Sequence, residues 1–331
     1  MTLPTMSKNV SAPIRQHGAA LLSAMLTVTL VATFAAAALW QQYRSIEVEA
    51  SERARVQVAW LLAGALDWSR LFLRIDGQNP KTNTMDHLGE PWATPFPESR
   101  LSTFLAADQN NTGGMTAEEQ VDVFLSGQVT DAQSFLNIYN LVDAGKKSKV
   151  DYDAFVKLFQ LLKLPVVELD DFVSRQIDAR DTKPANGNAP LMPQRVRQLT
   201  WLGLSPATLK QLTPYITLVD SRTPVNINTA SAEVIFASVP NLQLAEAKLL
   251  VFSRQSKPFG TLADASLAVT NLGQLNPNEH SVVTNYFQIM GRIRLEQTVV
   301  EVQSLVHRGN IGFITTKWRE RSIVASPEPT T

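Results

Sequence analysis

The residues that decide the fold are 19–40, AALLSAMLTVTLVATFAAAALW, a run of 22 residues without a charged side chain. As an α-helix this run would be about 33 Å long, which is enough to cross a bilayer core of roughly 30 Å. The basic residues Lys8 and Arg15 precede it, and three glutamates follow within residues 47–52. This charge distribution predicts a cytoplasmic N-terminus, with the rest of the chain on the other side of the membrane.

Three kinds of segment share this pattern. A secretory signal peptide would be cut near residues 36–38, and a plain signal anchor would not be cut. The third kind is the prepilin leader, in which a basic leader ends in glycine directly before the apolar run. Residues 1–18 resemble such a leader of type IV pilins and type II secretion pseudopilins. The resemblance implies that prepilin peptidase cuts between Gly18 and Ala19, that Ala19 is then N-methylated, and that the apolar segment is retained.

The sequence after the apolar run continues as a helix. No proline occurs between Pro13 and Pro80, and Gly64 is the only glycine from residue 19 to residue 76. Apolar side chains recur at steps of three and four, which is typical of an amphipathic helix. They are Val58, Leu61, Ala65, Trp68, Phe72 and Ile75. We therefore predict one helix over residues 19–76, about 87 Å long, whose second half lays this stripe on a sheet.

Position five of the mature chain, counted from Ala19, is Ser23. Most pilins and pseudopilins carry glutamate there, and the resemblance implies that this carboxylate pairs with the N-terminal amine of a neighbouring subunit. A carboxylate in lipid is costly unless it is paired. Ser23 can only return its hydroxyl to a backbone carbonyl one turn back. Either Ser23 has no role, or this subunit occupies a unique place in the assembly, such as the tip.

The remaining residues predict an α+β fold. Alternating apolar residues indicate strands at 286–295, 298–306 and 311–318, the last two forming a hairpin. Helical patterns fill residues 143–280, with helix starts at Ser205 and Thr229. The expected organisation is a leader (1–18), a spine helix (19–76, membrane span 19–40), a pilin-like α/β domain (77–142 and 281–331) and a helical insertion (143–280). The fold class is thus a pilin-like long N-terminal helix packed on an antiparallel sheet, with a large inserted all-α domain.

Several short segments, taken in order, resemble the minor pseudopilin K family of type II secretion. They are residues 64–68 (GALDW), 86–92 (DHLGEPW), 101–105 (LSTFL), 131–133 (DAQ), 201–203 (WLG) and 224–230 (PVNINTA). The resemblance implies an inner-membrane subunit with a periplasmic C-terminal domain, which initiates and caps the pseudopilus tip for export of folded proteins. Its implied partners are the minor pseudopilins I and J, the pseudopilus, prepilin peptidase and the assembly platform. A minor pilin of a type IV pilus tip is the alternative.

Residues 225–230 also resemble the start of helix-hairpin-helix modules, which bind DNA phosphates through backbone N–H groups. The corresponding turn, residues 238–243, lacks glycine and contains Pro240, which has no N–H to donate. Residues 225–270 hold three acids and three bases, whereas a phosphate-binding surface needs a basic excess. A helical packing unit is therefore favoured over a membrane-tethered DNA-binding protein, and nucleic acid is not an expected partner.

Composition argues against an enzyme. The chain of 331 residues has 30 basic and 30 acidic residues, four histidines far apart in sequence and no cysteine, which excludes a thiolate metal site and a cysteine nucleophile. No GxSxG, GxGxxG or HExxH motif occurs, so no cofactor is expected to be required. Calcium is the candidate ion, because the resemblance implies it and one polar stretch is rich in hard oxygen ligands. That stretch offers Asp108, Asn110, Asn111, Thr112, Glu118, Glu119 and Asp122.

Overall fold

The computed structural model describes residues 17–79, 84–100, 123–181, 189–269, 274–295, 298–309 and 313–325. The chain forms two compact units, Met1–Trp60 and Leu61–Thr331. A single helix, α1 (His17–Gln78), contributes its first part to one unit and its last turns to the other. The long helix predicted from the sequence is therefore confirmed.

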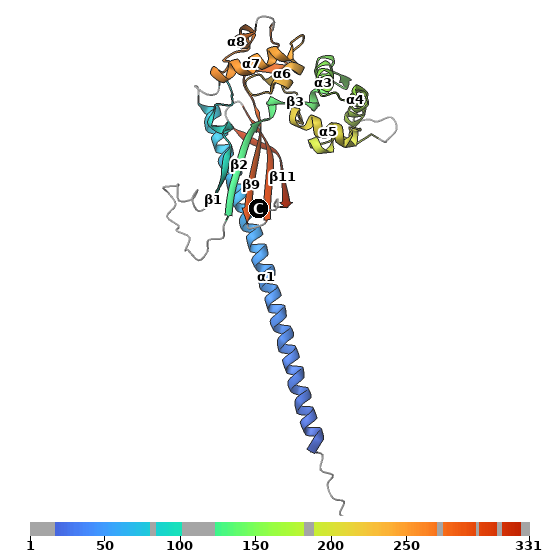
Figure 1. The fold of residues 1–331 in the computed structure, drawn as a ribbon, viewed down its shortest axis with the longest axis vertical. Coiled ribbons are helices and arrows are strands. Elements are labelled where there is room, and N and C mark those ends of the chain that lie inside the picture. Colours follow the sequence, from blue (N-terminus) through green and yellow to red (C-terminus); the bar gives the residue numbers. More distant parts are fainter. Residues whose placement is uncertain are drawn as a thin grey trace, which may run out of the picture. The chain divides into compact units, whose positions relative to one another are not determined.

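A five-stranded antiparallel sheet organises the second unit (Figure 1). In spatial order its strands are β1 (Phe96–Arg100), β2 (Val123–Asp131), β9 (Tyr286–Leu295), β10 (Thr298–Arg308) and β11 (Ile314–Ala325). The predicted C-terminal hairpin is confirmed, because β10 and β11 pair along their lengths with one register shift after Leu305. The strands β2 and β9 are neighbours, although residues 132–285 lie between them in sequence.

The last turns of α1 cover one face of this sheet with leucines. Leu62 and Leu73 are fully buried, and Leu62 lies against β9 beside Gly291. From Leu61 onward the stripe predicted to face the sheet was the wrong one, since Trp68 and Ile75 are more than half exposed. Two adjacent rows of this helix are apolar, and periodicity fixes the spacing of a row but not which row faces inward. The leucine row is the one that the sheet covers.

Short helices fill the sequence between β2 and β9. They are α3 (Lys149–Leu161), α4 (Val166–Arg180), α5 (Pro206–Leu212), α6 (Ala232–Ser238), α7 (Leu244–Ser256) and α8 (Leu262–Ala268). They share one hydrophobic core, which includes the fully buried Phe155, Phe159 and Phe172. In Figure 1 these helices gather beyond one end of the strands. The α+β fold is confirmed, while the domain boundaries remain a prediction.

Short bridges and 3-10 turns connect these helices to the sheet. Two parallel bridges join β3 (Leu136–Asn137) to β6 (Ile216–Thr217) and β7 (Val225–Asn226) to β8 (His280–Ser281), and β4 (Val142–Asp143) pairs with β5 (Lys146–Lys147). The 3-10 turns are η1 (Pro91–Ala93), η3 (Ala132–Ser134), η4 (Ile138–Leu141), η5 (Val196–Leu202) and η6 (Thr213–Tyr215). Ser205 caps α5 as predicted, because its hydroxyl accepts a hydrogen bond from the Thr208 N–H.

Candidate functional site

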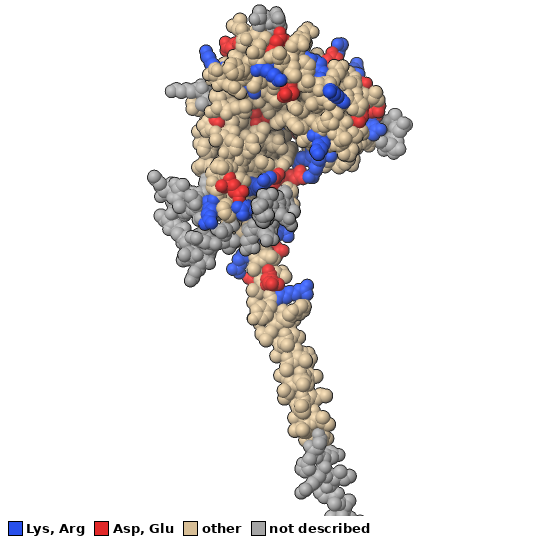
Figure 2. All heavy atoms as spheres, viewed as in Figure 1, with Lys and Arg blue, Asp and Glu red and all other residues tan. Residues whose placement is uncertain are grey.

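The predicted processing site lies at the start of α1. The helix begins at His17, so the Gly18–Ala19 bond falls in its first turn. Within the described residues, one helix is long and apolar enough to cross a membrane, with an 18-residue window of mean hydropathy 2.0. In Figure 2 the membrane-length apolar part of α1, which precedes the first basic side chains of the helix, has no acidic or basic side chains. Cleavage and methylation at Ala19 remain predictions.

Ser23, at position five, uses its hydroxyl within its own helix. Its Oγ donates to the carbonyl oxygen of Ala20 at 2.9 Å. Thr27 and Thr33 make the same kind of bond to Ala24 and Leu30. This is the contact that the sequence predicted for Ser23, and it leaves no charged group to meet the amine of another subunit. Whether position five directs assembly remains a prediction.

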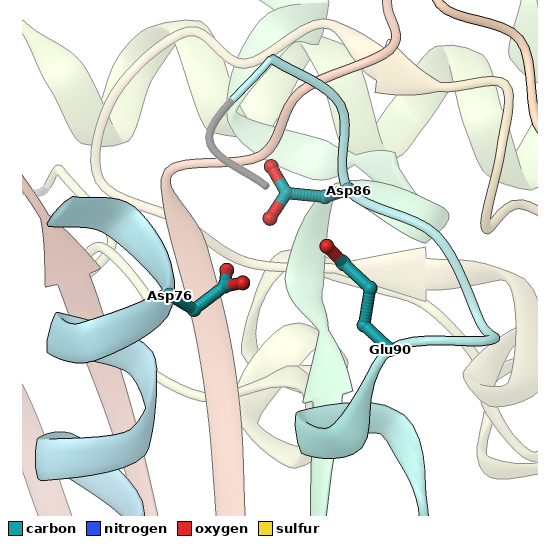
Figure 3. Close-up of side chains that lie close together, drawn as sticks. All are labelled: Asp76, Asp86 and Glu90. Atoms are coloured by element: carbon teal, nitrogen blue, oxygen red, sulfur yellow. The ribbon is translucent and has the colours of Figure 1, made fainter. Parts of the chain in front are cut away.

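Three carboxylates from the end of α1 and the following loop converge in the second unit (Figure 3). One oxygen from each of Asp76, Asp86 and Glu90 lies within 4.8 Å of the others. The guanidinium of Arg308, near the end of β10, is shared between two of them. Its Nη2 donates to both carboxylate oxygens of Asp86 at 2.6 Å, and its Nη1 donates to Asp76 Oδ2 at 2.8 Å.

Burial controls the protonation of this cluster. Desolvation raises the pKa of Asp86 to about 6, although the adjacent Arg308 lowers it. Desolvation likewise raises the pKa of Glu90 to about 7, and Glu90 Oε2 accepts hydrogen bonds from the His87 N–H and from Trp92 Nε1. Burial of a carboxylate disfavours its charged form. One guanidinium therefore binds Asp76 and Asp86, while burial favours the neutral forms of Asp86 and Glu90.

These carboxylates are of the ligand type that calcium takes, but their arrangement does not fit the ion. Arg308 already donates to both oxygens of Asp86 and to Asp76, so a cation would have to displace a buried guanidinium. This cluster therefore gives no argument for a bound metal ion. The predicted calcium ligands between Asp108 and Asp122 lie outside the described residues, and calcium binding there remains a prediction.

A second buried carboxylate, Asp131 at the end of β2, joins the sheet to the helices. It accepts hydrogen bonds from the Gln133 N–H at 2.6 Å, Thr229 Oγ1 at 2.5 Å, Thr284 Oγ1 at 2.6 Å and Asn226 Nδ2 at 2.9 Å. Its burial raises its pKa, while these hydrogen bonds lower it. Four donors from three segments meet at one side chain, and this fixes where the chain leaves the sheet and where it returns.

The two carboxylate sites are connected. The Thr284 N–H donates to Asp86 Oδ2 at 2.7 Å, and Asn226 Nδ2 donates to the Asp86 carbonyl at 3.1 Å. Arg308 Nη2 also donates to the Thr284 carbonyl. We call Asp86, Asp131, Asn226, Thr284 and Arg308 the polar junction. It ties α1, β2, β9 and β10 to the 225–230 segment and serves to position the helices on the sheet.

The polar junction explains why one predicted cap was wrong. Thr229 does not cap α6; Ser231 does, with its Oγ accepting from the Val234 N–H at 3.3 Å. The Thr229 hydroxyl instead donates to Asp131, which is 98 residues away in sequence. A threonine before a helix often caps it, but here the threonine hydroxyl donates to a buried carboxylate on a distant strand.

The helix-hairpin-helix-like segment packs against α3. The ammonium of Lys157, on α3, donates to the Phe236 and Val239 carbonyls at the end of α6 at 2.5 and 2.7 Å. Arg254, on α7, is buried and donates to the Ile227 carbonyl, so it adds no charge to the surface. Figure 2 shows acidic and basic side chains interspersed over the helices on the visible face. A DNA phosphate backbone would need a basic excess there.

A membrane-length helix that leads into an antiparallel sheet, with helices inserted between neighbouring strands, defines a pilin-type subunit. The sequence profile of the family described as "Type II secretion system (T2SS), protein K" matches residues 225–285. These residues supply Asn226 and Thr284 to the polar junction, and Thr229 donates to its Asp131.

Similar proteins extend the match to almost the whole chain. A type II secretion system protein K of Pseudomonas aeruginosa is 27% identical, over 96% of each chain. That of Klebsiella pneumoniae is 25% identical, over 86% of this chain and 91% of its own. The crystal structure of the GspK-GspI-GspJ complex from enterotoxigenic Escherichia coli contains a chain of the same fold, with a TM-score of 0.58 and 17% identity over 82% of this chain and 98% of that chain.

The chain is similar to type II secretion system protein K, and these matches support a minor pseudopilin of type II secretion. The resemblance found in the sequence is thereby confirmed. Sequence reasoning missed the polar junction itself. Its signal was present in the quoted segments, since Asp86, Asp131 and Asn226 all belong to them.

Proposed function

We propose that this minor pseudopilin occupies the tip of the pseudopilus, where it initiates assembly and caps the fibre for export of folded proteins across the outer membrane. The observation that carries the proposal is the position of the helices: residues 132–285 are inserted between two neighbouring strands, β2 and β9. A helical body at that place gives the subunit bulk that a helix and a sheet alone lack. We infer that this bulk prevents a further subunit from stacking above it.

The apolar helix supports a membrane-stored subunit. Residues 19–40 would hold the protein in the inner membrane with a single pass, the N-terminus in the cytoplasm and the C-terminal domain in the periplasm. Prepilin peptidase would remove residues 1–18, and Ala19 would become the methylated N-terminus. During assembly the same helix would leave the lipid and pack among the helices of other subunits.

A serine at position five is compatible with a subunit that is assembled first. A glutamate at position five would have to find the amine of a neighbouring subunit, because an unpaired carboxylate in lipid is costly. The Ser23 hydroxyl is already bonded to Ala20 and makes no such demand. A first subunit, which has no preceding subunit to pair with, would lose nothing by carrying serine there.

The partners we propose follow from the solved relative, which was crystallised as a GspK-GspI-GspJ complex. We expect pseudopilins I and J of this chain's own system to bind it, together with the pseudopilus, prepilin peptidase and the inner-membrane assembly platform. We propose the domain boundaries stated above for this assembly unit, and an assembly role rather than catalysis. The type IV pilus alternative is disfavoured, because the family match is to type II secretion.

Immunogold labelling of sheared fibres tests the tip position. In cells that overproduce the major pseudopilin, an antibody against this protein should label one end of a fibre with a single particle. An antibody against the major subunit, as the matched control, should label the whole length. Particles of the first antibody spread along the fibre, or a protein found only free in the periplasm, would contradict the proposal.

Calcium binding by residues 108–122 is tested separately. Calorimetric titration of the protein with calcium should release or absorb heat and raise the melting temperature if the predicted ligands bind the ion. No heat and no change in melting temperature would remove this prediction and leave the proposed tip position intact.

A further inference from the structure

A cleft of about 390 Å³ lies between the sheet and segments on both sides of α5 in the sequence. Side chains of β9, β10 and β11 form its floor, and residues 194–197 form part of the opposite wall. The floor is the sheet face that points away from α1, since Gln288 and Gln303 alternate with residues buried beneath that helix. Its volume falls in the range of clefts that hold small ligands or short peptide segments.

A buried donor in this cleft has no acceptor. The indole Nε1 of Trp318, on β11, is inaccessible to solvent and has no hydrogen-bond partner. The guanidinium of Arg195 lies 3.9 Å from the centre of the same ring. A buried N–H without a partner is destabilising, and an acceptor in the cleft would relieve this cost once the indole turned to expose the N–H.

The charged groups of the cleft favour an anionic ligand. Glu320 accepts a hydrogen bond from Arg195 Nε at 3.2 Å and forms an ion pair with Arg197, whose Nη2 lies 2.5 Å from Glu320 Oε1. Two guanidiniums thus face one carboxylate, which leaves an excess of one positive charge. The side chain of Arg197 is 70% exposed, so it can turn toward a second carboxylate at little cost.

The edge of the sheet favours an extended chain as the occupant. The strand β11 is the last in the sheet, and no described strand pairs with its outer edge. Trp318, Glu320 and Ser322 of this strand line the cleft, which therefore reaches the open edge. Unpaired backbone groups at such an edge can bind an added strand.

We propose that this cleft binds an extended polypeptide segment that carries an acidic side chain. On binding, the indole of Trp318 turns to expose Nε1, whose N–H then donates to a backbone carbonyl of the segment, and the carboxylate of the segment pairs with Arg197 and Arg195 beside Glu320. The segment runs along the open edge of β11. This assignment does not depend on the proposed position at the tip.

Fluorescence anisotropy with labelled peptides tests the proposal. The full-length protein in detergent micelles is titrated into an acetylated, amidated Thr-Glu-Thr-Glu-Thr peptide, with the Gln and Lys versions as probes of charge. The acidic peptide should bind most tightly, and the Lys version at least about tenfold more weakly. R197Q should weaken acidic-peptide binding about threefold to tenfold, and W318F, which keeps the ring and removes the donor, should do the same.

Two further variants make the test specific. E320Q frees both guanidiniums and should strengthen binding of the acidic peptide about threefold. The matched control R294Q removes an arginine from the same sheet face outside the cleft, where it pairs with Glu98, and should leave the affinity unchanged. The indole N–H signal that W318F removes from the NMR spectrum should shift when the acidic peptide is added to the wild-type protein.

Three results would overturn the proposal. They are equal affinity for the three peptides, unchanged affinity in both R197Q and E320Q, and an indole signal that does not move at saturating peptide. In those cases the arginines of this region only protect an exposed edge strand from aggregation, and water fills the cleft.

Discussion

Replacing Arg308 by methionine should be the most damaging single change to the second unit at neutral pH. Methionine keeps an unbranched apolar stem but removes the guanidinium, which is 95% buried. That guanidinium donates to Asp86, Asp76 and the Thr284 carbonyl. Asp86 has no exposed surface, so the substitution leaves a buried carboxylate without its cation.

The size of the effect depends on pH. Removing one partner of a buried ion pair costs about 3–5 kcal/mol, which for a unit of this size lowers the melting temperature by roughly 6–20 °C. The pKa of Asp86 is already about 6 and rises further without Arg308, so Asp86 is neutral at pH 5.5. At pH 5.5 we expect the free energy of unfolding to fall by only about 1–2 kcal/mol, because the hydrogen bonds of the guanidinium are still missing.

Thermal unfolding of the full-length protein in detergent, followed by near-UV circular dichroism at pH 7.5 and 5.5, measures both losses. The double variant R308M/D86N should recover part of the stability at pH 7.5, because the unpaired charge is gone. R294M is the matched control: its pair with Glu98 is partly exposed, and its loss should cost less than about 1 kcal/mol. Equal losses at both pH values, or no recovery in the double variant, would refute the electrostatic reasoning.

Three other predictions follow from the fold. L62A should lower the free energy of unfolding by about 2–5 kcal/mol, because Leu62 is fully buried. W68A should lower it by less than about 1 kcal/mol. The reverse order would support the stripe predicted from the sequence. K157M should speed amide hydrogen exchange at the end of α6 by about tenfold or more, since two carbonyls lose their donor, and unchanged exchange would show that Lys157 is dispensable. The melting temperature of the wild-type protein relative to that of the E90Q variant should rise as pH falls from about 7 to about 5. Burial raises the pKa of Glu90 to about 7, so the folded wild-type protein takes up a proton there that the variant cannot take up. The comparison removes the opposite effect of His280, whose pKa burial lowers to about 4, and a constant difference between the two proteins would contradict this.

Local patterns predicted those parts of the fold that depend on local chemistry. The absence of proline and the steps of three and four predicted α1, and alternation predicted β9 and the β10–β11 hairpin. The Ser205 cap was correct because its partner, the Thr208 N–H, is three residues away. In each case the deciding contact lies within the element or between consecutive strands.

The parts that failed depend on distant contacts. Thr229 looked like a helix cap, but its hydroxyl meets Asp131, and no local pattern reveals a partner 98 residues away. The phase of the α1 stripe depended on which of two apolar rows the sheet covers. The polar junction also escaped prediction, because Asp131 and Thr284 are 153 residues apart, and the short segments that contain its residues were recognised only by resemblance.

Mass spectrometry of the N-terminus of the protein isolated from its native membrane tests the central claim most directly. That claim is that residues 19–40 are retained as a permanent helix and are not a cleaved export signal. We predict that the mature chain begins at a methylated Ala19 and lacks residues 1–18. A chain that begins near residue 40, or one that still carries residues 1–18, would contradict the account.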